Sequence, residues 1–403
     1  MRHRIGSWIG WLLAIVVAVG IYDLRDELGA DMAQPDAALS VDAVEMDAGS
    51  TGEELFAEYA GENLSFWDVD SPPASLSDDR YVYGTLDDEC RHVYDEIYEA
   101  ISVHADTVQV STTDADVIER AYRALMADHG EIFWVSGYSY TRYTRGEDVV
   151  GMEFMPGYTK TQEERENLQE EIDAKVNGVL SGISPEASDY EKAKYVFDYL
   201  ACNVAYRVGA PENQNILSVF LYGETVCQGY ASAMQYLLTR LGLLSAIVTG
   251  EADGTPHAWN LVCMDGEYYY MDPTWGASGN TDENMERYAD HSYFGVTTED
   301  IGKSHVASDH FALPDCIAWE NNYFVREGLY FAQWDPDTVG GRCAVGFEQG
   351  DVALAVRFST EELRQQAVQY LIHEAHIVDY CEGLTQLYYV EDEWLNVVIF
   401  RFR

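Results

Sequence analysis

The chain has 403 residues, and 47% of them are apolar, which is enough for one or two hydrophobic cores. Its 70 Asp and Glu residues far outnumber its 24 Lys and Arg residues, giving a formal net charge of −46. Repulsion from phosphates excludes nucleic acid as a partner and keeps the body of the protein off an anionic membrane. Solubility or a saline environment explains this charge most simply, although it would also attract cationic peptides.

The chain opens on an uncharged, apolar run of 18 residues, Ile5–Tyr22, preceded by Arg2 and Arg4. This pattern predicts that residues 1–25 are a membrane anchor whose start lies in the cytoplasm. A cleaved signal peptide is the alternative, because the run is near the lower length limit and residues 18–20 are small. Either outcome exports the body: as a single-pass protein of the cell membrane with an extracytoplasmic body, or as a secreted protein.

Two further segments precede the motif region. Residues 26–83 are rich in acidic, Ala, Ser, Gly and Pro residues, which predicts a self-repelling, disordered tether. Residues 84–185 then predict an N-terminal α/β module, with amphipathic helices, a short strand, two aromatic strands and a charged helix over about 161–180. The aromatic strands are expected to form core, with a substrate cleft as the alternative.

A helix is predicted to begin at Cys227. Apolar positions from Tyr230 to Leu241 follow helical spacing, and Gly242 supplies the stop. The cysteine therefore lies in the first turn, where the helix N-terminus stabilises a thiolate.

A β-hairpin is predicted downstream, from His257 to Asp272, because Asp265-Gly266 separates two apolar runs. With these two residues as the loop, Met264 pairs with Glu267, and His257 becomes a diagonal cross-strand neighbour of Asp272. The carboxylate is then within reach of the imidazole.

Cys227, His257 and Asp272 together predict a catalytic triad. An adjacent imidazolium and a helix N-terminus both favour the thiolate form of a cysteine, so Cys227 and His257 are expected to rest as an ion pair. Asp272 would fix the tautomer of the histidine and stabilise its positive charge.

These residues resemble the transglutaminase-like superfamily. Its signature is a cysteine opening a helix, a histidine followed by an aromatic strand, and an aspartate at the end of the next strand. Cys227 in VCQGYA, His257 in HAWN and Asp272 in DPTW match that signature. The resemblance covers about residues 188–315 and implies an α+β fold: a papain-like core, over 186–318, with a helix packed on an antiparallel sheet.

The resemblance also implies an upstream helix in SDYEKAKYVFDYLACNVAYR and an acyl-thioester intermediate without a cofactor. Family members often use a side chain from the loop before the cysteine in the oxyanion hole, which makes Gln214 the candidate here. A loop-capping amide is the alternative role for Gln214. The family includes cross-linking transglutaminases, peptidases, amidases and inactive proteins, so the resemblance leaves the reaction open.

Residues 319–403 predict a small C-terminal accessory α/β domain. DVALAVRF alternates as a strand does, Thr360 caps a helix, and LTQLYYVEDEWLNVVIFRF forms a closing hairpin. No motif in this segment indicates binding to a ligand, a partner or the cell wall.

Seven cysteines leave six besides Cys227, and at most one disulfide is expected, between Cys343 and Cys381. No metal site is predicted. His373-Glu374-Ala375-His376 lacks the i, i+4 histidine spacing of a zinc helix, and His305, Asp309 and His310 form only a loop cluster.

Two classes of function remain open. The first is an extracytoplasmic thiol-dependent hydrolase of peptide or glutamine-type amides, with peptide or protein substrates that are cationic or associated with the cell wall. Hydrolysis is expected over protein cross-linking, because nothing here resembles the calcium-binding segments or multidomain framework of the animal cross-linking enzymes. The second class is a catalytically idle scaffold in which the cleft only binds.

Overall fold

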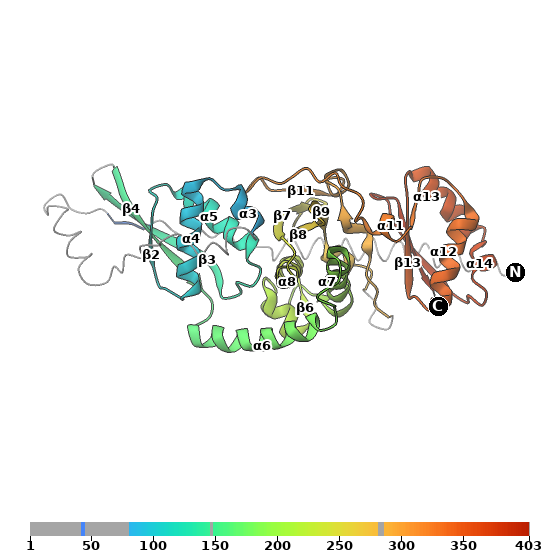
Figure 1. Ribbon diagram of the computed structural model, residues 1–403, viewed down its shortest axis with the longest axis horizontal. Coiled ribbons are helices and arrows are strands. Elements are labelled where there is room, and N and C mark those ends of the chain that lie inside the picture. The colour runs from blue at the N-terminus through green and yellow to red at the C-terminus, as the bar shows by residue number, and fades with distance from the viewer. Residues whose placement is uncertain (1–41, 45–79, 146–147, 281–285, 403) are drawn as a thin grey trace. The chain divides into compact units, whose positions relative to one another are not determined.

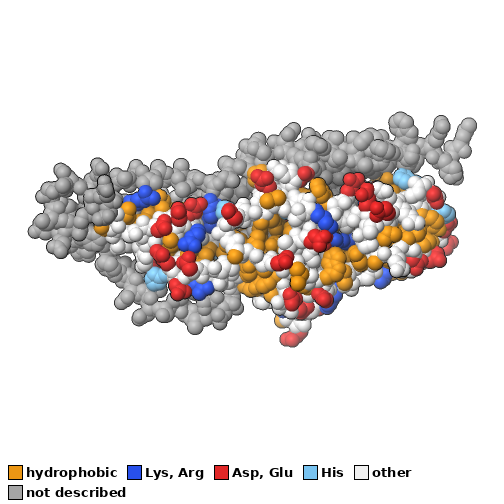
Figure 2. Space-filling model, turned by 90° about the horizontal axis from the view of Figure 1, so that it is seen from above, with side chains coloured by type: hydrophobic (Ala, Val, Ile, Leu, Met, Phe, Trp, Pro, Cys, Tyr) orange, Lys and Arg blue, Asp and Glu red, His pale blue; other side chains and the backbone are white. Residues whose placement is uncertain are grey.

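The computed structural model describes residues 42–44, 80–145, 148–280 and 286–402 (Figure 1). The predicted anchor and all of the predicted tether except 42–44 and 80–83 lie outside the described residues. No helix of the described part is both long enough and apolar enough to cross a bilayer. Acidic side chains are spread over the face shown in Figure 2, as the net charge leads one to expect.

The chain divides into two compact units. Among the described residues, those of 33–173 and 309–313 make the N-terminal unit, and those of 174–308 and 314–403 make the C-terminal unit. Helix α6 (Gln162–Leu180) contains the boundary between them.

The N-terminal unit combines helices with an antiparallel hairpin (Figure 1). Asp87 and Asp114 cap the starts of α4 and α5 by accepting hydrogen bonds from backbone N–H groups. Tyr122 of α5 and Phe154 of the hairpin are both buried, so this part of the aromatic strands is core. Its elements are α3 (Tyr81–Thr85), α4 (Asp88–Ser102), α5 (Ala115–Asp128), β1 (Asp42–Val44), β2 (Val108–Val110), β3 (Val135–Arg145) and β4 (Asp148–Tyr158), with sheet order β1-β3-β4-β2.

The C-terminal unit is built on a five-stranded antiparallel sheet of order β10-β9-β8-β7-β11. Its strands are β7 (Ser245–Ala252), β8 (Thr255–Met264), β9 (Glu267–Met271), β10 (Phe294–Val296) and β11 (His305–Ala307). Around it lie α7 (Asp189–Asn203), η1 (Ser218–Tyr222), α8 (Cys227–Arg240), α9 (Pro273–Gly276), η2 (His291–Tyr293), α10 (Thr298–Ile301) and the short parallel pair β5 (Ala205–Tyr206) and β6 (Glu224–Thr225).

Helix α8 packs directly on this sheet. Its Ala231 forms an apolar cluster with Ile247 of β7 and Ala258 of β8. The small side chains bring helix and sheet close enough for Asn260 Nδ2 to donate to the Ala231 carbonyl oxygen at 2.9 Å. This arrangement is the α+β core, a helix on an antiparallel sheet, that the sequence predicts.

A second sheet, of order β12-β13-β15-β14, completes the same unit. It comprises β12 (Tyr330–Phe331), β13 (Ala353–Phe358), β14 (Leu387–Asp392) and β15 (Val397–Phe402), with α11 (Tyr323–Arg326), α12 (Pro336–Gln349), α13 (Glu361–Ala367), η3 (Val368–His373) and α14 (Ile377–Tyr380). Buried Arg357 of β13 forms a salt bridge with buried Asp300 of α10 at 2.7 Å, which ties this sheet to the core.

Sequence patterns missed helix α12, while the predicted strand, the Thr360 cap and the closing hairpin are present. Helix α12 contains three glycines, Gly340, Gly341 and Gly346, which weaken the helical pattern of its sequence. The start was nevertheless readable, since Asp335 caps the helix and Pro336 occupies its first position.

The suggested disulfide is wrong for this structure. All seven cysteines, which all lie within the described residues, are free thiols. Cys343 and Cys381 are both buried, and burial raises the pKa of each thiol.

Candidate functional site

Cys227 is the first residue of helix α8, as predicted, and it is fully buried. Val226 precedes it in an extended conformation and provides no side-chain cap. Gly229 allows the chain to fold tightly here, because a Cβ at that position would lie 1.9 Å from Thr225 Oγ1. The hydroxyl of Tyr230 donates to the Val204 carbonyl oxygen at 2.6 Å and anchors the first turn. The helix start is therefore held rigidly while its N–H groups remain uncapped by side chains.

The hairpin has the predicted register. Met264 pairs with Glu267, and Asp265 and Gly266 form the turn with positive φ of 54° and 84°. His257 lies on β8, and Asp272 directly follows β9. His257 Nε2 donates to Asp272 Oδ2 at 2.8 Å, so the cross-strand contact expected from the sequence is present.

The Asp272 side chain is completely buried, and both of its carboxylate oxygens accept hydrogen bonds. Oδ1 accepts hydrogen bonds from the backbone N–H groups of Thr274 at 2.9 Å and Trp275 at 3.1 Å, as the cap of helix α9. Oδ2 accepts from His257 and, at 3.2 Å, from His305 Nε2. Burial opposes ionisation, but attraction to His257 and these hydrogen bonds outweigh it and hold the pKa of Asp272 well below its usual range.

His257 connects this carboxylate to the thiol. Its side chain is 5% exposed, donates to Asp272 and interacts with the side chain of Cys227. Burial alone would lower its pKa, yet the Asp272 carboxylate and the cysteine raise the pKa of His257 to about 10. The imidazolium form therefore prevails at neutral pH, which is the charge state that supports a cysteine nucleophile.

His305 has a place that the sequence did not reveal. The sequence places it in a loop cluster with Asp309 and His310, but its Nε2 contacts Asp272. His310 belongs to the N-terminal unit, where its Nε2 lies 3.4 Å from Arg123 Nη1. The sequence shows only a histidine in a short apolar segment. Because His305 is 33 residues from Asp272, no local pattern predicts their contact.

The ligand-type atoms of His257, Asp272 and His305 all lie within 4.8 Å of one another, so these three residues could hold a metal ion. Both histidine Nε2 atoms, however, already donate to Asp272. In the other motif that resembles a metal site, His376 Nδ1 lies 2.9 Å from Asp379. The absence of a metal stays a prediction.

Gln214 is exposed and its amide donates to Asn213 Oδ1 at 3.2 Å. Among the described residues, no hydrogen bond joins it to Cys227. This loop contact matches the alternative, loop-bound role, and the oxyanion role stays a prediction.

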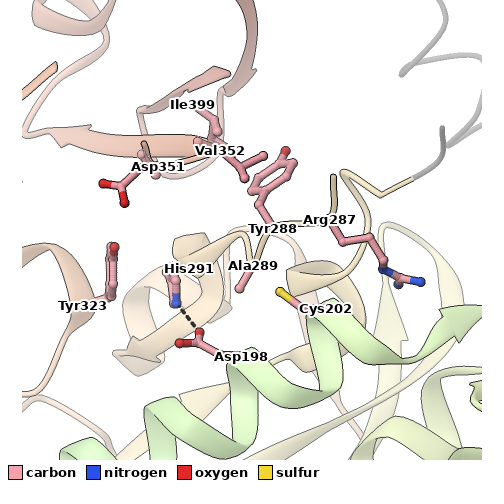
Figure 3. A pocket seen from close by; sticks show the side chains of 12 residues that line it. Asp198, Cys202, Arg287, Tyr288, Ala289, His291, Tyr323, Asp351, Val352 and Ile399 are labelled. Atoms are coloured by element: carbon pink, nitrogen blue, oxygen red, sulfur yellow. Dashed lines mark hydrogen bonds and ion pairs between the residues drawn. The ribbon is translucent and has the colours of Figure 1, made fainter. Parts of the chain in front are cut away.

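A separate cavity of about 250 Å³ lies between α7 and the second sheet (Figure 3). Asp198 and Cys202 come from α7, and His291, Arg287 and Tyr323 also line the cavity. His291 Nε2 contacts Asp198 Oδ1 at 2.6 Å. The cavity thus contains the same three residue types as the triad, but none of the triad residues lines it.

Comparison with known proteins identifies a family for part of the chain. Residues 177–273 match the transglutaminase-like superfamily. The kyphoscoliosis peptidase of Mus musculus is 24% identical over 131 residues, which are 28% of this chain and 20% of that protein. The chain therefore spans about a fifth of the length of that relative.

Solved structures also align with the chain. One is a TGase, 14% identical, with a TM-score of 0.26, over 36% of this chain and 53% of the other. Another is the periplasmic domain of TgpA from Pseudomonas aeruginosa bound to ethylmercury, 17% identical, with a TM-score of 0.20, over 32% of this chain and 58% of the other.

Proposed function

We propose that the transglutaminase-like domain of this chain makes it a thiol-dependent hydrolase of peptide or glutamine-type amides. The observation that carries the proposal is the continuous chain of contacts from Asp272 through a positively charged His257 to Cys227. A structural role alone does not require a buried imidazolium next to a cysteine at the start of a helix.

The first half of the reaction forms an acyl-enzyme. The Cys227 sulfur attacks the amide carbonyl carbon, and the uncapped N–H groups of the first turn of α8 face the developing oxyanion. His257 then gives its proton to the leaving nitrogen, the C–N bond breaks, and a thioester on Cys227 remains. Asp272 keeps the ring oriented throughout, because its carboxylate is fixed by backbone N–H groups.

The second half releases the product. Water attacks the thioester carbonyl, and His257 accepts the proton of that water. The C–S bond breaks to give the carboxylic acid product, and the cysteine and imidazolium return to their starting state. Attack by an amine instead of water would give transamidation through the same intermediate.

An idle scaffold is the second candidate, and complete burial of Cys227 favours it, because a substrate cannot reach a covered thiol. Alkylation by iodoacetamide separates the two functions. Selective modification of Cys227 at pH 6 supports an accessible, activated thiolate. Modification that begins only at about pH 8.5 or above, where an ordinary thiol ionises, supports the scaffold.

The reaction type is tested with an amide substrate selected from a peptide library. Released carboxylate is compared with amine-coupled product in the presence of a lysine analogue at about millimolar concentration. We expect hydrolysis to predominate. Predominant coupling would overturn this proposal and make the protein an acyltransferase.

We further propose that the body acts outside the cytoplasm, on peptide or protein substrates. The support is the sequence pattern around residues 5–22 and the net charge of −46, which would attract cationic substrates. Protease added to intact cells should degrade the chain beyond residue 26. Full protection of the chain would contradict this location.

A further inference from the structure

His305 reaches the triad from the far edge of the sheet. It opens β11, which pairs with β7, so two strands separate it from β9 and Asp272. Gly250 of β7 permits this pairing, because a Cβ there would lie 2.1 Å from the Val306 carbonyl oxygen. The close approach of β11 places His305 Nε2 3.2 Å from Asp272 Oδ2.

The His305 ring is enclosed by aromatic side chains. Its centroid lies 4.7 Å from that of Trp275, 5.0 Å from that of Trp259 and 5.3 Å from that of Tyr293, and its side chain has no exposure. Burial lowers the pKa of His305, and the positive charge of His257 adds to this, while Asp272 and a backbone carbonyl oppose it without prevailing. The ring is therefore neutral at neutral pH.

The hydrogen bonds then fix the position of each proton. Ionised Asp272 can only accept, so the proton of the neutral His305 ring is on Nε2 and Nδ1 is an acceptor. The Ser304 hydroxyl lies 2.8 Å from Nδ1 and must donate to it. Its oxygen in turn accepts from the Tyr293 hydroxyl at 2.9 Å, since burial raises the pKa of Tyr293 and keeps the phenol protonated.

We propose that His305 is a positioning residue of the reaction: its neutral ring, held in one tautomer by Ser304 and Tyr293, donates to Asp272 Oδ2 and fixes the carboxylate against His257. The proposal rests on the function proposed above and extends the triad by three residues. Each group donates its hydrogen bond to the next: Tyr293 to Ser304, Ser304 to His305, and His305 to Asp272.

Loss of this hydrogen bond has two expected effects. The Asp272 carboxylate would keep three of its four bonds and could turn away from His257, which lowers kcat but leaves KM unchanged. A buried carboxylate with fewer donors also protonates more easily, so its pKa rises. The acid limb of Cys227 alkylation should then move to higher pH, because a carboxylate that is no longer fixed against His257 supports the imidazolium less.

The first test compares His305→Leu with His305→Gln. Leucine fills the space without a donor, whereas the glutamine amide nitrogen can take the place of Nε2. We expect His305→Leu to lower kcat about tenfold or more and to shift the acid limb upward by about one pH unit, the effect of one charge-assisted hydrogen bond. His305→Gln should restore most of both. Equal profiles for the two variants would contradict the proposal.

The second test leaves His305 in place. Ser304→Ala removes the hydroxyl that fixes the tautomer and should lower kcat several-fold at constant KM, while Ser304→Thr should retain the wild-type rate. Ser245→Ala is the matched control, because Ser245 is a buried serine of β7 whose hydroxyl has no hydrogen-bond partner in the described part of the chain. If Ser304→Ala has the same kcat as Ser245→Ala, the proposed positioning of His305 by Ser304 is refuted, even if His305→Leu does not fold.

Wild-type alkylation separates failure of this inference from failure of the proposed function. If wild-type Cys227 does not react selectively at pH 6, the hydrolase itself is wrong. If the wild type reacts but His305→Leu and Ser304→Ala keep its pH profile and kcat, only the positioning role is wrong.

Discussion

The triad and the cavity of Figure 3 each bring together a cysteine, a histidine and an aspartate in the same compact unit, yet their charge states differ. The pKa of His257 is raised to about 10, whereas burial lowers the pKa of His291 even though Asp198 lies 2.6 Å from it. Residue types alone therefore do not make a nucleophilic site.

Two features explain the difference. Asp198 also pairs with Lys194 at 2.6 Å, and that ammonium disfavours protonation of His291, whereas Asp272 is held by neutral donors besides His257. The two cysteines also lie at opposite ends of their helices. Cys227 begins α8, but Cys202 lies in the last turn of α7, where the helix dipole disfavours a thiolate.

Burial and the negative charge of Asp198 together raise the pKa of the Cys202 thiol. Among the described residues, no hydrogen bond joins this thiol to His291. The cavity is therefore a natural internal control for each property assigned to the triad.

The largest contrast is expected from cysteine removal. Cys227→Ala should abolish hydrolysis, since no other group can form the thioester, and the fold should survive because the residue opens a helix. Cys202→Ala should keep kcat within about twofold. Turnover of a peptide-amide substrate measures both, and circular dichroism checks the fold. Comparable losses of kcat in the two variants would show that the two sites do not differ in function.

Exchange of the aspartates gives the next largest effect. Asp272→Asn should lower kcat by about 10³–10⁴-fold, because the amide no longer supports the imidazolium or fixes its tautomer. Asp198→Asn should leave kcat within a few-fold while lowering the melting temperature, since Lys194 and His291 lose their partner. Near-full activity of Asp272→Asn would show that the triad assignment is wrong.

Thiol reactivity should differ by about 100-fold. At pH 6, iodoacetamide should modify Cys227 well before Cys202, because Cys227 lies beside the His257 imidazolium, whereas burial raises the pKa of the Cys202 thiol. Peptide mapping by mass spectrometry gives both rates in one sample. The His257→Gln variant should remove the advantage of Cys227, and an unchanged advantage would exclude the ion pair.

The pH dependence of stability should have opposite signs for the two histidines. With its raised pKa, His257 stabilises the fold fully below its unfolded value near 6.5, and this contribution disappears as the pH rises toward 10. His291 has a lowered pKa, so its contribution decreases as the pH falls below about 6.5 and the unfolded chain takes up the proton.

Melting temperatures of His257→Gln and His291→Gln between pH 5 and pH 10 test these signs. Relative to the wild type, the first variant should lose its deficit at high pH and the second at low pH, by a few degrees. Parallel curves for the two variants would show that the histidines share one charge state.

Local rules in the sequence determined much of the site. The Asp265-Gly266 turn sets the register that joins His257 to Asp272, and apolar spacing sets the start of α8 at Cys227. Both depend on residues close in the chain, so periodicity and turn chemistry suffice to predict them. The α+β class followed from the resemblance to the transglutaminase-like superfamily that these residues carry.

Tertiary structure alone decided the rest. His305 joins Asp272 only because β11 pairs along β7, and Cys202 with His291 lines a cavity only because the second sheet packs over α7. Contacts between distant segments carry no local periodicity. Charge states behave in the same way, because burial and the full set of neighbours determine whether a histidine beside an aspartate is an imidazolium, as His257 is, or a neutral ring, as His305 is.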